Sequence, residues 1–153
     1  MTEIELVVAK IREDFGAGDA KRDAGLTTPS DIQRFDNICY GKDPVWQSLD
    51  LYRPKSMDEK KLPVIVSVHG GAWVYGTKEI YQFYCMRLAQ FGFAVVNFNY
   101  RLAPENKFPS SLEDTNLVFQ WIEANKETYQ LDTDNVFAVG DSAGGHLLGL
   151  YAG

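Results

Sequence analysis

The sequence holds few cysteines, no long apolar run and no basic opening segment, and each of these shortages excludes a class of protein. Two cysteines, Cys39 and Cys85, are too few for a disulfide framework in a chain of 153 residues. Both have apolar neighbours in the sequence, so we expect free, buried thiols, which suit the reducing cytoplasm. No apolar run approaches the roughly eighteen residues of a membrane span, and the acidic start at Met1–Glu5 does not match a secretory signal peptide.

Positive charge is scarce as well. The chain has 15 Lys and Arg against 21 Asp and Glu, for a formal net charge of −6, and no basic cluster is longer than Lys60–Lys61. We therefore expect neither a nucleic-acid partner nor binding to an anionic membrane surface. The histidines, His69 and His146, are only two and lie far apart in the sequence, so we expect no metal site.

A Gly-x-Ser-x-Gly motif at Gly140–Gly144 is the strongest chemical signal. An apolar run at 136–139 precedes the motif and a plausible helix follows it, which is the order of elements around a nucleophile elbow. Gly140 and Gly144 stand where a Cβ would collide with the neighbouring strand and helix, so a sharp turn becomes feasible. Ser142 is therefore the candidate nucleophile, and the alternative interpretation is a serine that only caps the helix.

A second glycine motif, His69–Trp73, follows the apolar run at 64–68. Acyl transfer to a serine places negative charge on the former carbonyl oxygen, and each N–H group aimed at that oxygen is worth about 2.7–4 kcal/mol. We expect these donors to be Gly70, Gly71 and Ala143, the residue after the nucleophile. We also expect Trp73 and Tyr75 to line the substrate pocket, with packing in the core as the alternative.

Three motifs together resemble those of the α/β-hydrolase carboxylesterases of the hormone-sensitive-lipase-like group, from about Asp50 to the last residue. The motifs are His69–Trp73, Tyr100–Glu105 and Gly140–Gly145. The resemblance implies hydrolysis of a small-molecule ester by Ser142, an oxyanion hole at Gly70, Gly71 and Ala143, and no cofactor. It gives His69 a hydrogen bond that stabilises its loop. The Gly-Gly-His146 ending is similar to acetyl-esterase relatives, some of which act on acylated sugars.

The order of the catalytic triad marks a departure from that family. In this fold the acid and the histidine follow the serine, yet only eleven residues follow Ser142 and none is acidic. His146 lies one helical turn beyond Ser142 and should point away from it, so it is disfavoured as the general base, as is His69. The chain looks like the N-terminal part of a single α/β-hydrolase domain, with the missing C-terminal half as a partner. A non-catalytic or truncated hydrolase-like protein and an amidase or peptidase remain as alternatives.

Periodicity predicts an α/β fold with a mostly parallel sheet, because strands alternate with helices in right-handed crossovers. A capping box at Thr2–Glu5 should open a helix that Gly16 ends, followed by a loop to residue 30. This segment is either a cap over the active site or simple packing. The expected strands are 31–40, 46–52, 64–68, 93–98 and 135–139, and a turn at 41–44 joins the first two. The expected later helices are 80–91 and 110–128. A capping box at Ser110–Glu113 should open the second of these helices.

Charged residues near the motifs are expected to act through structure. Asp141 should contribute electrostatically beside a helix N-terminus, and Arg101 and Glu105 should hold their loop by charge-assisted hydrogen bonds. Asp114 should be a solvated or structural carboxylate. The strand at 136–139 has the composition of a fully buried strand, but no further strand follows it. We therefore expect an aggregation-prone edge and poor solubility of this polypeptide alone.

Overall fold

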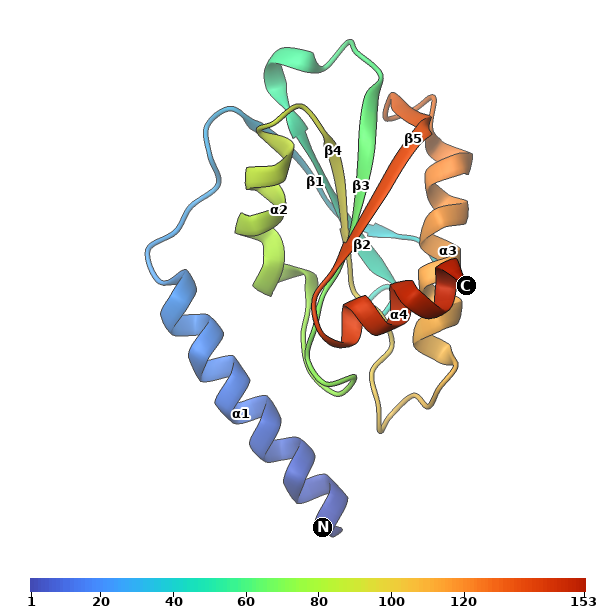
Figure 1. Cartoon of the computed structure of the whole chain (residues 1–153). Coiled ribbons are helices and arrows are strands. Elements are labelled where there is room, and N and C mark those ends of the chain that lie inside the picture. The colour runs from blue at the N-terminus through green and yellow to red at the C-terminus, as the bar shows by residue number, and fades with distance from the viewer.

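The apolar runs of the sequence build a five-stranded mixed sheet with helices on both faces (Figure 1). The computed structural model describes the whole chain, Met1–Gly153. The strand order is β1-β2-β4-β3-β5, in which β3 runs parallel to β4 and β5, whereas β2 pairs antiparallel with β1 and β4. The expected hairpin and the parallel strands that follow it are confirmed. The bounds are β1 Ile32–Cys39, β2 Ser48–Pro54, β3 Leu62–Val68, β4 Ala94–Phe98 and β5 Leu131–Gly140.

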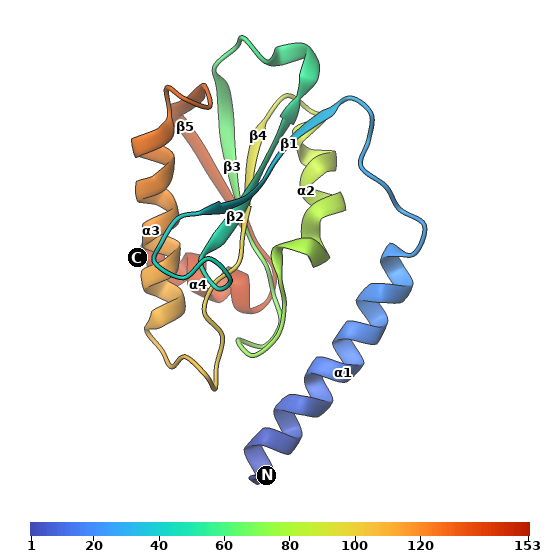
Figure 2. The same ribbon diagram turned by 180° about the vertical axis from the view of Figure 1, so that it is seen from behind.

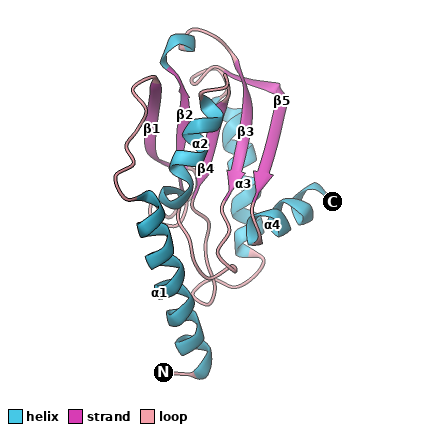
Figure 3. Cartoon of the chain, turned by 60° about the vertical axis from the view of Figure 1, so that its left-hand side comes forward, coloured by secondary structure: helices cyan, strands magenta, loops and turns pink.

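Helices cover the two faces unequally. One face carries α2 and the other carries α3 and α4, as the views in Figure 2 and Figure 3 show. The N-terminal helix α1 lies apart from the sheet and projects away from it (Figure 1). The helices are α1 Glu3–Asp23, α2 Gln82–Ala89, α3 Ser110–Asn125 and α4 Ala143–Ala152, with short 3-10 turns η1 Lys55–Met57 and η2 Lys78–Tyr81.

The alternation of side chains along β3 explains this layering. Val64 and Val66 pack with Ile122 of α3 in one apolar cluster, whereas Ile65 packs with Met86 of α2 in the other. Successive side chains of a strand point to opposite faces, so a continuous apolar run is stable only when both faces are covered. Each of these buried side chains contributes about 1.5–3 kcal/mol.

Helix α1 differs from the expectation at its C-terminal end. The capping box is confirmed, since the Thr2 hydroxyl accepts from the Glu5 amide at 3.2 Å. Gly16, however, does not end the helix, which continues to Asp23. A helical glycine is about 1 kcal/mol less favourable than alanine. Here the glycine lies against the Tyr75 side chain, whose hydroxyl oxygen would be 3.9 Å and nearest ring carbon 4.0 Å from an added Cβ, and this tertiary contact outweighs propensity.

The start of α3 also differs. It begins at Ser110 as expected, but the capping box does not form. The Ser110 hydroxyl donates to the Lys107 carbonyl at 2.7 Å, and the Glu113 carboxylate accepts from Arg101 at 3.2 Å. The helix ends at Asn125, three residues before the expected Thr128.

Two burial expectations are corrected by the structure. Strand β5 pairs only with β3, so it is the sheet edge and its residue Phe137 is 54% exposed instead of buried. Cys39 is exposed and Cys85 is buried, and both are free thiols. Burial raises the pKa of Cys85 to about 12, so its thiol stays protonated.

None of the helices has the length and apolar character needed to cross a bilayer.

Candidate active site

The carboxyl ends of β3 and β5 lie side by side, and Val68 pairs with Gly140 at the last position of the ladder. The glycine loop that follows β3 and the turn that follows β5 therefore face each other. Open α/β sheets bind ligands at the carboxyl ends of their strands. The fold thus brings the two sequence motifs together although about seventy residues separate them.

The turn after β5 has the strained geometry of a nucleophile elbow. Ser142 adopts φ 50° and ψ −114°, a region that non-glycine residues rarely occupy. A Cβ on Gly140 would lie 2.6 Å from the Gly144 backbone, and one on Gly144 would lie 2.0 Å from the Val68 carbonyl oxygen. Both glycines are therefore required for the turn to close. Ser142 is exposed and its hydroxyl makes no capping hydrogen bond, so the helix-cap alternative is not observed.

The buried His69 side chain holds the glycine loop in place. Its buried ring stacks on Tyr100 with the centroids 4.2 Å apart, and its Nδ1 donates to the Gly70 carbonyl at 2.7 Å. The Tyr100 hydroxyl donates to the His69 carbonyl at 2.7 Å. Burial lowers the pKa of His69 to about 4, so the ring is neutral at physiological pH. The imidazole stabilises the loop, as the resemblance implies, and does not contact Ser142.

Three backbone amides of the glycine loop are left available to a side chain or a ligand. The N–H groups of Gly70, Gly71 and Ala72 make no backbone hydrogen bond. Gly71 has φ +138° and a Cβ there would lie 1.9 Å from the Tyr75 carbonyl oxygen, so only glycine fits. Ala72 has φ +52°, a left-handed conformation that has no sequence signal in a residue other than glycine.

A cavity of about 430 Å³ contains Ser142 and the loop. Helix α1 forms its outer wall, so the N-terminal segment reaches the candidate site. Tyr75 lines the cavity, and its hydroxyl donates to Asp19 of α1 at 2.6 Å. Trp73 and Ala143 do not line it. The lining residues are Asp14, Phe15, Gly18, Asp19, Gly70, Gly71, Ala72, Tyr75, Ile80, Tyr81, Asp141 and Ser142.

Trp73 lies instead over α4. Its indole Nε1 donates to His146 Nδ1 at 3.3 Å, and the two rings meet edge to face with their centroids 5.4 Å apart. This contact occupies the imidazole nitrogen that faces the loop. The His146 backbone amide donates to the Ser142 carbonyl at 3.1 Å, but neither histidine ring is hydrogen-bonded to the Ser142 hydroxyl. No group of three or more His, Cys, Asp or Glu side chains could hold a metal ion.

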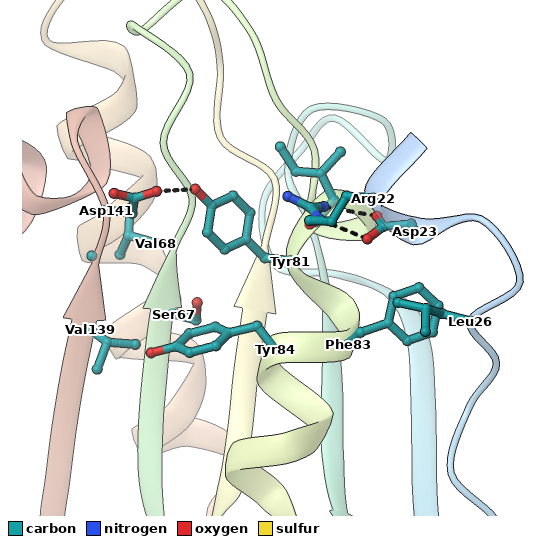
Figure 4. Close-up of a pocket in the computed structure, with 12 residues that line it drawn as sticks. Arg22, Asp23, Leu26, Ser67, Val68, Tyr81, Phe83, Tyr84, Val139 and Asp141 are labelled. Carbon is teal, nitrogen blue, oxygen red and sulfur yellow. Dashed lines mark hydrogen bonds and ion pairs between the residues drawn. The ribbon is translucent and has the colours of Figure 1, made fainter. Parts of the chain in front are cut away.

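Asp141, beside the serine, accepts a hydrogen bond from the Tyr81 hydroxyl at 2.5 Å (Figure 4). This contact could not be predicted from the sequence, since the two residues are 60 positions apart. Tyr81 and Asp141 separate the Ser142 cavity from a second cavity of about 530 Å³ between α2 and the ends of β3 and β5. Phe83, Tyr84 and other side chains line that second cavity (Figure 4).

A buried cation fixes the segment that carries Tyr81. Lys78 is 2% exposed, and its Nζ lies 2.9 Å from Asp50 and 2.6 Å from Glu79. It also donates to the Asn37 side-chain oxygen at 2.9 Å. Burial alone would lower the pKa of Lys78, but these carboxylates raise it above its ordinary value. The ion pairs hold the start of η2 against the sheet.

The motif at Tyr100–Glu105, after β4, forms three ion pairs, one of them the contact of Arg101 with Glu113 described above. Arg101 donates to the fully buried Asp114 through its amide at 2.7 Å and through Nε at 3.0 Å. Asp114 is therefore a structural carboxylate and not a solvated one. Glu105 accepts two hydrogen bonds from Arg12 of α1, at 2.8 and 2.9 Å. The motif therefore holds both α3 and α1, as charge-assisted hydrogen bonds are expected to do.

Comparisons with known proteins find a matching family and related ester hydrolases. A family model described as BD-FAE matches residues 49–153. Esterase LipC of Mycobacterium tuberculosis is 38% identical over 114 residues, which cover 74% of this chain and 28% of that protein. The probable carboxylic ester hydrolase LipM of the same organism is 33% identical over 146 residues, which cover 92% of this chain and 34% of that protein.

Among solved structures, esterase B from Lactobacillus rhamnosis is similar with a TM-score of 0.89 and 32% identity, over 99% of this chain and 50% of that chain. A bacterial heroin esterase has a TM-score of 0.78 and 28% identity, over 92% of this chain and 44% of that chain. The chain thus spans about a third of the length of the curated relatives and half of the structural ones. The expected α/β-hydrolase architecture is confirmed over that part.

Proposed function

Because the chain belongs to the BD-FAE family and is related to the carboxylic ester hydrolases of the hormone-sensitive-lipase-like group, we propose that it carries the nucleophile and oxyanion hole of a serine esterase. One observation carries the proposal. Ser142 stands in a strained strand-to-helix turn and shares a cavity with the glycine loop. A strained residue that the surrounding backbone enforces is typical of a functional site.

The proposed chemistry is acyl transfer in two steps. The Ser142 Oγ attacks the carbonyl carbon of a short-chain ester, and the alcohol leaves with a proton. Water then releases the acyl group as a carboxylic acid. We expect Gly71 and Ala143 to donate their N–H groups to the oxyanion, with Ala72 as a third donor. The Gly70 amide, which we also proposed for this role, faces the Tyr81 hydroxyl oxygen.

A general base must remove the proton of Ser142, because a serine hydroxyl is a poor nucleophile without one. Neither the His69 ring nor the His146 ring is hydrogen-bonded to the Ser142 hydroxyl, so neither is assigned as this base. This observation favours a second candidate function, a non-catalytic hydrolase-like protein that binds esters without cleaving them. The two functions differ in whether Ser142 becomes acylated.

The substrate proposal follows from the cavity. Its volume of about 430 Å³ suits a small molecule, and Tyr75 and Phe15 supply its aromatic walls. A tributyrin phosphonate inhibits the structurally similar esterase B, which supports an ester substrate here. Trp73 lies outside the cavity and contributes by holding the loop to α4. The free thiols of Cys39 and Cys85 support a reducing compartment, so we propose the cytoplasm as the location.

Labelling with a fluorophosphonate probe tests the proposal, applied to the 153-residue chain and to any longer product of the same gene. We expect covalent labelling of the wild-type protein in at least one of these forms and none in Ser142→Ala. Paired p-nitrophenyl acetate and p-nitroacetanilide assays then separate an esterase from an amidase. Labelling that survives Ser142→Ala would contradict the assignment of the nucleophile. Absence of labelling in every form would favour the non-catalytic function.

A further inference from the structure

Tyr81 is the side chain that touches both halves of the candidate site. Its hydroxyl donates to the Asp141 carboxylate at 2.5 Å, one residue before Ser142. On the other side, its oxygen lies 3.4 Å from the position of a Cβ on Gly70, and the Gly70 amide faces it. The phenol thus lies between the Gly70 backbone of the glycine loop and a carboxylate acceptor on the elbow. Figure 4 shows its contact with Asp141.

The direction of the hydroxyl is determined by these neighbours. A carboxylate only accepts hydrogen bonds, so the phenol hydrogen points to Asp141 and the oxygen lone pairs are left for Gly70. Burial raises the pKa of Tyr81 to about 12, and Asp141 adds to this shift, so the group remains a neutral donor throughout the physiological range. The Lys78 ion pairs fix the turn from which the ring extends.

We propose that Tyr81 is a positioning residue whose hydroxyl holds the glycine loop at a fixed separation from the nucleophile elbow. This inference rests on the proposed function of Ser142. Donors of an oxyanion hole act only when they are placed correctly relative to the nucleophile, and errors of about 1 Å cost about 100-fold in rate. Tyr81 sets that placement through Gly70, which directly precedes the proposed donor Gly71.

The matched pair Tyr81→Phe and Tyr84→Phe tests the role of the hydroxyl. Tyr84 belongs to the same segment and its hydroxyl has no hydrogen-bond partner within the chain, so its loss should be silent. Tyr81→Phe keeps the ring and removes the bridge. In addition, Asp141→Asn keeps an acceptor for the phenol, whereas Asp141→Ala removes it. The probes are amide NMR of the 153-residue chain and fluorophosphonate labelling of the form that reacts.

In Tyr81→Phe we expect the amide signals of Gly70 and Ser142 to shift and the Gly70 amide to exchange at least tenfold faster. Labelling of Ser142 should slow 10- to 100-fold, through the maximal rate constant and not through probe affinity. Asp141→Asn should retain most of both properties, Asp141→Ala should resemble Tyr81→Phe, and Tyr84→Phe should resemble the wild type. That pattern would support a positioning role over a general loss of structure.

Two results would overturn the inference. The first is an unchanged Gly70 amide in Tyr81→Phe, which would show that no bridge exists, whatever the labelling rate. The second is a disturbed amide with unchanged labelling, which would show that the bridge does not position the reacting groups. A wild-type Ser142 that never labels would instead refute the proposed function. The NMR comparison would then still decide whether Tyr81 joins the two loops.

Discussion

Acid should destabilise the fold through His69. The imidazole has no exposed surface and its Nε2 has no hydrogen-bond partner. Its neighbours are the stacked Tyr100 ring and the Gly70 carbonyl, with the Glu79 carboxylate near enough to oppose the shift weakly. Burial dominates and lowers the pKa from 6.5 to about 4, because the loss of solvation of the charged ring outweighs the Gly70 hydrogen bond and the attraction of Glu79.

The sign and the size of this pH effect on stability follow from the protons that His69 binds in the folded and the unfolded states. In the unfolded chain the His69 ring takes up a proton near pH 6.5, whereas in the folded protein it stays neutral down to about pH 4. The unfolded state therefore binds more protons between these values, so stability falls as the pH falls through them. Each pKa unit corresponds to about 1.36 kcal/mol, so this ring alone removes about 3 kcal/mol of unfolding free energy across the window.

Urea denaturation of the wild type and His69→Asn at a series of pH values measures this effect. The asparagine amide does not titrate, and its nitrogen retains a donor for the Gly70 carbonyl. The carboxylates titrate in both proteins and cancel in the difference. We expect the stability advantage of the wild type over the variant to shrink by about 3 kcal/mol between about pH 7 and pH 4. An advantage that is constant over this range would refute the reasoning.

Two further predictions follow from the elbow and the sheet edge. Gly144→Ala places a Cβ 2.0 Å from a backbone carbonyl oxygen, so it should lower the unfolding free energy by at least about 3 kcal/mol or prevent folding. In Gly149→Ala the new Cβ meets nothing within 4 Å, so the variant should gain about 0.5–1 kcal/mol from helix propensity. Thermal denaturation compares the two variants, and equal effects would contradict the close contact of Gly144 with the Val68 carbonyl oxygen. The unpaired edge of β5 should make the 153-residue chain self-associate, and Phe137→Lys should suppress this in sedimentation velocity. A monodisperse wild-type monomer would rule out edge pairing.

Features set by local physics could be predicted from the sequence. The uninterrupted apolar run that became β3 indicates a strand covered on both faces, and the structure covers both. Glycines at Gly140 and Gly144 around a serine indicate a turn in which a Cβ does not fit, and the distances confirm it. The Thr2–Glu5 capping box likewise formed, since it needs only four consecutive residues.

Contacts between distant segments could not be predicted. Gly16 has the sequence signature of a helix end, but the Tyr75 ring packs against it and the helix continues. Glu113 matches the capping pattern, yet Arg101 offers it a stronger charge-assisted partner. The contact of Tyr81 with Asp141 joins elements that only the crossover of the chain brings together. These contacts decide the site, and they depend on the finished topology.

The loose attachment of α1 has a consequence for how such proteins diversify. Val8 is the one buried residue of this helix, and polar side chains such as Arg12 and Asp19 make its links to the body. The wall of the cavity at Asp14 and Phe15 thus lies outside the two apolar clusters that cover the sheet, and Phe15 packs edge to face on the Tyr75 ring. Substitutions on that wall can accumulate without weakening the strained turn that holds the serine. Selection can therefore change which molecules enter while the reacting groups stay as they are.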